Sequence, residues 1–384
     1  MNHSIEKNVT KKICFLGSAL SRRDPRIFWR QGRSLASAGY DATFIVSDSE
    51  TDDSEDGVRT ISSGFSTSSR IKRMLYSKKY LYKKALQINA DIYQVSEPEL
   101  IPLGLKLKRI GKKVIYDARE DYPRMIFEKD YIPKVLRKPI SSMLEKYMCK
   151  SLKKFDAVFS VTPHIVEYIK KIWECREVHL VTNYPIVDKD FHLSFDEYDN
   201  RGNILCYIGN AYRASRQEIT FKALEKISGI KYIIAGRIQN DYKSELVILP
   251  YWKRLEFIDG IEKEGLEKLY SHVSIGNSIR DFSDSGAPKG SLGVIKIFEY
   301  MEAALPIICT NIELWKDIVD KYKCGIYVNP NNSDEIGEAL LYLTEHKEEA
   351  YQMGQNGRRA VLEEYNWENQ ANRYIGVINK VLIS

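Results

Sequence analysis

The segment "VIKIFEYMEAALPIICT", residues 294–310, places a helical pattern and a strand-like run on the two sides of Leu305 and Pro306. Its first part spaces apolar residues as one face of a helix does, and its end, "PIICT", is a short apolar run typical of a buried strand. Glu299 lies inside the helical part, more than one turn from its start. A helix followed at once by a buried strand is the repeating unit of a parallel sheet. The segment therefore predicts an α/β protein.

The same alternation of strand and helix patterns runs along most of the chain. Buried strands are predicted where apolar runs end in turn-forming residues, as in "KKICFLGSAL" (11–20), "DATFIVSD" (41–48), "KKVIYDA" (112–118) and "FDAVFSVT" (155–162). The acidic stretch "SDSETDDSEDG", residues 47–57, is predicted to be a loop.

The periodicity stops once, which indicates a domain boundary. Polar and turn-forming residues take over near 179–203, and a second alternating series begins at "NILCYIGNA", residues 203–211. We therefore predict two doubly wound parallel-sheet domains facing across a cleft. The first covers residues 1–190 and the second 200–365, and a C-terminal helix at about 366–384 packs back on the first.

Composition fits such a protein and excludes several others. The chain has 384 residues, of which 43% are hydrophobic, and its mean hydropathy is −0.37. No segment has the apolar core of a signal peptide or the roughly 18 apolar residues of a spanning helix, so we predict a cytoplasmic protein. The six cysteines form no CxxC pair, and we expect buried thiols and no metal site.

One basic stretch stands out within a net charge of +6. Residues 70–84 interleave aromatic and aliphatic side chains with seven basic residues: Arg70, Lys72, Arg73, Lys78, Lys79, Lys83 and Lys84. On a helix this pattern suits peripheral contact with an anionic membrane, here at the inner membrane face. The alternative is an ordinary packed helix with solvated lysines. Nucleic acid is not expected as a partner because no binding motif accompanies this local patch.

Motifs for other chemistries are missing. No GxGxxG follows a strand, "GAPKGS" lacks the ending of a P-loop, and neither GxSxG nor HExxH occurs. The turn "GSLG", formed by Gly290, Ser291, Leu292 and Gly293, instead precedes the helix expected from Val294. Backbone N–H groups at a helix start form a natural phosphate cradle.

An ordered set of motifs resembles a known family. "KIFEYMEAALPII" (296–308) resembles the nucleotide-sugar helix of retaining, family 4 type glycosyltransferases of the GT-B fold. Further similar motifs occur in the expected order: "DPRI" (24–27), "IYQVSEPEL" (92–100), "YDAREDYP" (116–123), "TNYP" (182–185) and "NWENQ" (366–370). The resemblance covers most of the chain and implies two Rossmann-like domains.

The resemblance implies roles for residues of the second domain. Glu299 matches a glutamate that accepts hydrogen bonds from the nucleotide ribose. Among the basic residues, Arg216 is the best match to those that contact the diphosphate in the family, and Arg213 is the next best. We take Arg216 and Glu299 as the catalytic candidates. The donor site further includes Gly17, Arg237, Lys296 and the turn 290–293, with Gly17 allowing close approach of the donor.

On the acceptor and donor-sugar side, the expected residues are Arg26, Ser96, Arg119 and Glu120. The sequence departs from the family pattern here. Gln94 and Ser96 stand where a histidine is common, Arg119 replaces another, and Ser291 stands in place of the family's first glutamate. Contacts to the donor sugar are therefore altered, whereas those to the nucleotide are largely kept.

The resemblance implies a retaining glycosyltransferase that moves a sugar from a nucleotide-sugar donor to a glycan or lipid-linked acceptor in bacterial surface polysaccharide biosynthesis. It implies no metal and no further cofactor, since fixed dipoles and cations stabilise the leaving diphosphate. A non-catalytic nucleotide-sugar-binding homologue or partner subunit is the main alternative. A nucleotide-sugar epimerase is disfavoured because no histidine occurs between His3 and His164.

Overall fold

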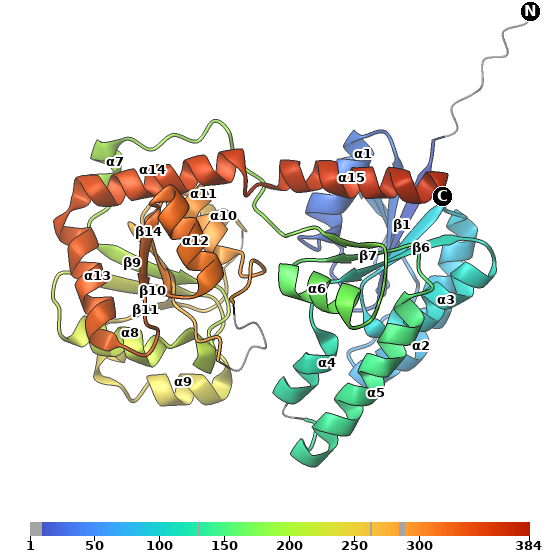
Figure 1. The fold of residues 1–384 in the computed structure, drawn as a ribbon, viewed down its shortest axis with the longest axis horizontal. Coiled ribbons are helices and arrows are strands. Elements are labelled where there is room, and N and C mark those ends of the chain that lie inside the picture. The colour runs from blue at the N-terminus through green and yellow to red at the C-terminus, as the bar shows by residue number, and fades with distance from the viewer. Residues whose placement is uncertain (1–9, 130, 262, 284–288) are drawn as a thin grey trace, which may run out of the picture. The chain divides into compact units, whose positions relative to one another are not determined.

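The computed structural model describes residues 10–129, 131–261, 263–283 and 289–384. It divides into two compact units (Figure 1): Met1–Asn183 with Glu368–Ser384, and Tyr184–Trp367. The sequence places the boundary between residues 190 and 200, whereas the division in the structure follows Asn183. The second division falls at Trp367, close to the residue 366 at which the C-terminal helix was expected.

The first unit contains an eight-stranded sheet in the order β3-β4-β2-β1-β5-β6-β7-β8. Its strands are β1 (Lys12–Gly17), β2 (Asp41–Val46), β3 (Asp53–Glu55), β4 (Val58–Ser62), β5 (Ile92–Val95), β6 (Lys113–Ala118), β7 (Ala157–Ser160) and β8 (Val178–Leu180). All neighbours pair in parallel except β3 and β4. The strand order reverses between β1 and β5, and parallel sheets bind ligands beyond the carboxyl ends of their strands at such a point.

The antiparallel hairpin corrects one prediction. Residues 53–55 were expected to lie in a loop but form β3, because Asp56 and Gly57 both adopt left-handed backbone angles (φ 50° and 77°) and turn the chain back. An Asp-Gly pair of this conformation is a preferred two-residue hairpin turn. Two arginines of the loop after β1 hold the hairpin: Arg22 contacts Asp53 at 3.3 Å and Arg23 contacts Glu55 at 2.6 Å.

Helical segments connect these strands and cover the sheet (Figure 1). They are the π-helix η1 (Ile27–Gly32), α1 (Arg33–Ser37), α2 (Arg70–Ile88), η2 (Pro98–Leu100), α3 (Ile101–Arg109), α4 (Tyr122–Met125), η3 (Ile126–Glu128), α5 (Lys134–Leu152) and α6 (Pro163–Lys171). The C-terminal helix α15 (Trp367–Ile383) joins this unit from the far end of the chain. Its Tyr374 ring lies 5.1 Å from that of Phe159 on β7, and its hydroxyl donates to Gln94 on β5 at 3.0 Å.

The second unit contains six parallel strands in the order β11-β10-β9-β12-β13-β14. They are β9 (Ile204–Ile208), β10 (Lys231–Ala235), β11 (Glu256–Ile258), β12 (Ile275–Ser278), β13 (Ile307–Thr310) and β14 (Gly325–Val328). Numbered within the unit, this is the 3-2-1-4-5-6 order of a Rossmann fold, which reverses between β9 and β12. The helical segments are α7 (Phe195–Asn200), η4 (Arg213–Ser215), α8 (Gln217–Glu225), α9 (Asn240–Leu246), η5 (Pro250–Arg254), α10 (Lys263–Tyr270), α11 (Lys296–Glu302), α12 (Glu313–Tyr322), α13 (Ser333–Glu345) and α14 (Lys347–Glu363).

Helix α11 and strand β13 form the predicted helix–strand unit, although the helix begins at Lys296 and not at Val294. Tyr300 fixes α11 to the sheet. A Cβ on Gly276 of β12 would lie 2.4 Å from the Tyr300 ring, so only glycine leaves room for it. The Ile208 N–H at the end of β9 donates to the Tyr300 hydroxyl at 2.9 Å. This packing sets the position of Lys296 and Glu299 on the same helix.

None of the helices that the structure describes has both the length and the hydrophobicity needed to cross a bilayer. The six cysteines are unpaired, and all except Cys149 are buried, as expected for thiols that pack in the core.

Candidate functional site

Two glycines shape the carboxyl edge of the second sheet. Gly236, which follows β10, has φ +138°, and a Cβ there would lie 2.4 Å from the carbonyl oxygen of Gly209, which follows β9. The two loops therefore touch through their backbones. Gly209 itself has φ +109°, and a Cβ on it would lie 3.8 Å from Lys296 Nζ. The end of β9 is thus bare backbone beside a lysine.

Lys296 is partly buried at this edge. Its Nζ lies 3.5 Å from the centroid of the Tyr207 ring on β9, a cation–π contact. Burial disfavours the ammonium form, and the nearby charge of Arg280 adds to this effect, so the pKa of Lys296 falls to about 7 although Glu299 opposes the shift. The sequence assigned Lys296 to the donor site. The structure places it at the switch point of the second sheet, where the strand order reverses between β9 and β12.

Arg280 is a second cation at this edge, and our sequence reasoning missed it. Its guanidinium lies 5.1 Å from the ring centroid of Tyr212 and 5.2 Å from that of Phe282. Within the described part of the chain, its buried Nε has no hydrogen-bond partner. Its backbone N–H donates to Thr310 Oγ1 at 2.8 Å, which ties the loop after β12 to the end of β13. The sequence signal that could have identified Arg280 is a basic residue shortly after a central strand.

Arg216 and Arg213 are both paired within the protein. Arg216 caps α8 with a left-handed φ of 47°, and its Nε donates to Asp281 Oδ2 at 3.1 Å. Burial alone would raise the pKa of Asp281, but the Ser283 N–H and Arg216 together lower it to about 2. Arg213 forms an ion pair with Glu245, and both side chains are exposed. Arg237 is also exposed.

The turn at 290–293 is closed by its own serine. Gly290 has a left-handed φ of +92°, and Ser291 Oγ accepts the Gly293 N–H at 3.0 Å. The Ser291 carbonyl accepts the indole N–H of Trp315 at 3.2 Å, and Leu292 packs against the apolar core. The Gly293 N–H is therefore already used, and the turn lies two residues before α11 rather than directly at its start.

Glu299 lies one turn into α11 and is partly buried. Burial is the largest cause of the raised pKa of Tyr270 on α10, and the charge of Glu299 is the second largest. The two side chains are therefore neighbours. The structure thus gathers Lys296, Arg280 and Glu299 near the end of β9. Asp281, the residue after Arg280, forms the ion pair with Arg216.

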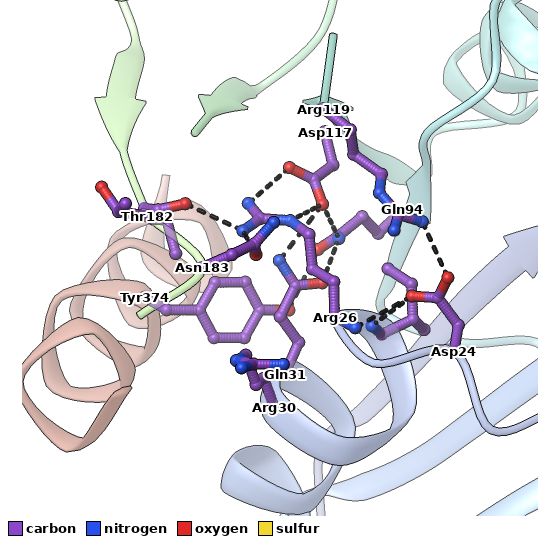
Figure 2. A network of polar contacts seen from close by, with 12 residues as sticks. Asp24, Arg26, Arg30, Gln31, Gln94, Asp117, Arg119, Thr182, Asn183 and Tyr374 are labelled. Carbon is purple, nitrogen blue, oxygen red and sulfur yellow. Dashed lines mark hydrogen bonds and ion pairs between the residues drawn. The ribbon is translucent and has the colours of Figure 1, made fainter. Parts of the chain in front are cut away.

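In the first unit, Arg26 is a correction. This residue was expected to contact the acceptor but is only 1% exposed. Its Nε and one terminal nitrogen donate to Asp117 at 2.7 Å each, and the other terminal nitrogen donates to the Val181 carbonyl at 2.8 Å and to Asn183 Oδ1 at 2.5 Å (Figure 2). Gln94, which stands at a family histidine position, donates to Gln31 at 2.8 Å within the same network. The guanidinium is therefore fully engaged inside the domain.

The remaining expected residues of this unit lie around the same sheet edge. Arg119 is 22% exposed and donates to Asp24 at 3.0 Å. Ser96 is buried and Glu120 is exposed. A Cβ on Gly17 would lie 3.1 Å from Leu20 and from Phe44, so its small size serves packing within the protein, and its role beside the donor stays a prediction.

Glu97 was also missed, and it lies at the switch point of the first sheet. Its Oε1 accepts the Ser18 N–H at 2.9 Å and the Ala19 N–H at 2.8 Å, which joins the end of β5 to the end of β1. Burial raises the pKa of Glu97 to about 7, against the effect of the Ala19 N–H. Among the described residues, no three histidine, cysteine or acidic side chains converge as a metal site requires.

Comparisons with known proteins agree with this architecture. The family profile "Glycosyltransferase Family 4" matches residues 26–191, and "Glycosyl transferases group 1" matches residues 190–360. A search of curated proteins gave no match. Together the two profiles match residues 26–360, which include every strand of the two sheets except β1.

Several solved structures are similar in fold. Sucrose-phosphate synthase from Thermosynechococcus elongatus is 16% identical, with a TM-score of 0.72 over 97% of this chain and 99% of that one. HepE from Anabaena in complex with UDP-glucose is 12% identical, with a TM-score of 0.69 over 96% and 99%. WaaG, a glycosyltransferase involved in lipopolysaccharide biosynthesis, is 14% identical, with a TM-score of 0.68 over 95% and 100%. The chain therefore belongs to the glycosyltransferases of the group 1 and family 4 type and has their GT-B fold.

Proposed function

We propose that the protein is a retaining glycosyltransferase that moves a sugar from a nucleoside-diphosphate sugar to a hydroxyl of a glycan or lipid-linked acceptor, in bacterial surface polysaccharide assembly. The observation that carries the donor class is a pair of cations at the switch point of the second sheet: Lys296 lies beside the bare backbone of Gly209, and the charge of Arg280 lowers the pKa of Lys296. The structure of HepE contains UDP-glucose and WaaG is involved in lipopolysaccharide biosynthesis, which supports these substrate classes.

The proposed reaction breaks the bond between the anomeric carbon and the diphosphate oxygen and forms a bond from that carbon to the acceptor oxygen on the same face. The departing diphosphate takes up the acceptor proton. Lys296 and Arg280 stabilise its developing charge, because cations in a partly buried site act more strongly than in water. Glu299 accepts hydrogen bonds from the ribose, which orients the donor.

Arg216 contributes only by changing partner. It is held by Asp281 in the structure, and a diphosphate would compete with that carboxylate for its donors. Arginine suits such an exchange because its planar fork binds carboxylate and phosphate in the same way. We therefore assign Arg280 and Lys296 the larger share of charge stabilisation.

A non-catalytic donor-binding protein is the second candidate, and one observation favours it. Ser291, which replaces an acidic residue of the family pattern, is used to close its own turn, and so offers the donor sugar no carboxylate. This candidate predicts donor binding without turnover.

The test is release of nucleoside diphosphate from a panel of UDP-, GDP-, dTDP- and ADP-sugars, with and without acceptor extract. The proposal predicts release from one nucleotide class, a loss of at least about 100-fold in Arg280→Met, and no change when EDTA removes divalent metals. Product analysis must show a retained anomeric configuration. Binding without any release would favour the non-catalytic candidate, and loss of activity in EDTA would contradict the metal-free mechanism.

A further inference from the structure

A small cavity lies beside the carboxyl ends of β1 and β2 in the first unit. Its volume is about 200 Å³, and since a water molecule takes about 30 Å³ in the liquid, several waters or one small hydroxylated ring fit inside. The residues that line it include Ser18 after β1, Ser47 after β2, Phe65 and Thr67 after β4, and Arg73 on α2. Three hydroxyl groups, one guanidinium and one aromatic ring therefore surround the same space.

Two of these side chains keep a polar atom without a partner. Among the described residues, neither Ser47 Oγ nor Arg73 Nε makes a hydrogen bond, and both atoms are buried. Leaving buried polar atoms unpaired is costly, and native proteins rarely do so without a reason. Both atoms belong to residues that line the cavity, so a polar ligand there would supply the missing partners.

The charges around the cavity favour a neutral ligand over an anion. Arg73 lies 3.7 Å from Glu99, which also accepts the Ser18 hydroxyl at 2.9 Å. Glu97 is bound to the Ser18 N–H on the same loop. One cation thus faces two acidic residues, and a phosphate or carboxylate would meet repulsion.

The aromatic ring at the cavity is held in place. Phe65 stacks on Tyr80 of α2, with centroids 4.8 Å apart and ring planes 17° from parallel. A sugar or cyclic polyol ring presents C–H groups on its faces and hydroxyl groups around its edge. It therefore matches an apolar wall flanked by hydroxyl groups and a guanidinium.

We propose that this cavity binds a neutral hydroxylated ring of the acceptor, with Ser47 and Arg73 hydrogen-bonded to its hydroxyl groups. This inference rests on the proposed function, because it names the class of ring that this glycosyltransferase accepts. It also replaces Arg26, whose burial removes it from any acceptor site.

Saturation-transfer NMR on the full chain tests the inference, with methyl α-D-glucopyranoside and myo-inositol as neutral probes and inorganic phosphate as the anionic competitor. Ser47→Val and Arg73→Met each remove one of the unpaired polar groups. Lys79→Met is the matched control, because it removes one positive charge from an exposed position on the same helix. Thermal stabilisation by nucleotide sugars is measured on each variant.

We expect saturation of at least one neutral probe in the wild type and in Lys79→Met, and about fivefold weaker binding in Ser47→Val and Arg73→Met. Donor stabilisation should be the same in all four proteins. Three outcomes would overturn the inference if donor stabilisation persists. They are saturation of neither probe, equal saturation in all variants, and displacement of both probes by phosphate. Loss of donor stabilisation in the wild type itself would instead contradict the proposed function.

Discussion

Lys296 is partly buried beside Tyr207, and its pKa falls to about 7, well below the usual value of a lysine. A bound diphosphate would place negative charge nearby and raise this pKa toward its usual value. Donor binding at about pH 8 should therefore take up a proton from the buffer. Calorimetry in two buffers of different ionisation enthalpy checks this: the observed binding enthalpies should differ.

The control for this prediction is Lys296→Met. In that variant the enthalpies in the two buffers should agree more closely, because the proton-binding group is gone. Equal enthalpies for the wild type in both buffers would contradict the placement of Lys296 at the diphosphate.

Arg26, which the sequence analysis assigned to ligand binding, forms a fully buried ion pair with Asp117. Removing one partner of such a pair leaves the other charge buried without compensation. We expect Arg26→Met to lower the free energy of unfolding by about 3–5 kcal/mol, measured by urea denaturation. Arg213→Met, which breaks the exposed pair with Glu245, should change it by less than about 1 kcal/mol. Equal effects of both substitutions would show that the buried network does not stabilise the first unit.

Helix α2 carries exposed apolar side chains among its basic residues. It buries only Ser77, Leu81 and Ala85, whereas several large apolar side chains are exposed among its basic residues: Ile71, Met74, Leu75, Tyr76, Tyr80 and Leu86. On the neighbouring segments, Tyr131 lies under Arg70 at 4.6 Å, and Val135 on α5 is 83% exposed. Contact with an anionic membrane surface requires such a combination of apolar and basic groups, and that contact stays a prediction.

We expect the double substitution Met74→Ser and Leu75→Ser to weaken binding to vesicles containing phosphatidylglycerol by more than about tenfold, measured by sedimentation. Ile248→Ser, at an exposed apolar residue of the second unit, is the matched control and should bind like the wild type. Binding that is equal for neutral and anionic vesicles, or unaffected by the double substitution, would favour the ordinary packed helix.

At the scale of elements, the sequence predicts most strands because parallel strands are buried on both faces and read as continuous apolar runs. The helix–strand unit at 294–310 is confirmed for the same reason. The β3 hairpin was missed because its strand is short, acidic and at the sheet edge, so only the Asp-Gly turn marked it.

The candidate site was less predictable, because its geometry depends on pairs distant in sequence. Arg26 and Asp117 are 91 residues apart, and Arg216 and Asp281 are 65 apart. No local pattern reveals that these arginines already have carboxylate partners. Lys296 was identified because it lies on the helix that carries the family motif, whereas Arg280 follows β12, whose place beside β9 at the reversal of strand order becomes evident only from the sheet order.

For the whole molecule, the proposed function requires a nucleotide-sugar site at the switch point of the second sheet. The most direct test is thermal stabilisation by UDP-, GDP-, dTDP- and ADP-sugars. A ligand at about 100 times its dissociation constant adds about 2.7 kcal/mol when it binds only the folded state. Lys316→Met is the matched control for Lys296→Met, since Lys316 lies 5.2 Å from the centroid of the Tyr327 ring on the edge strand β14.

We expect stabilisation by one nucleotide class, reduced strongly in Lys296→Met and Glu299→Ala and retained in Lys316→Met. No stabilisation by any of the four classes, or equal stabilisation in all three variants, would contradict the proposed function.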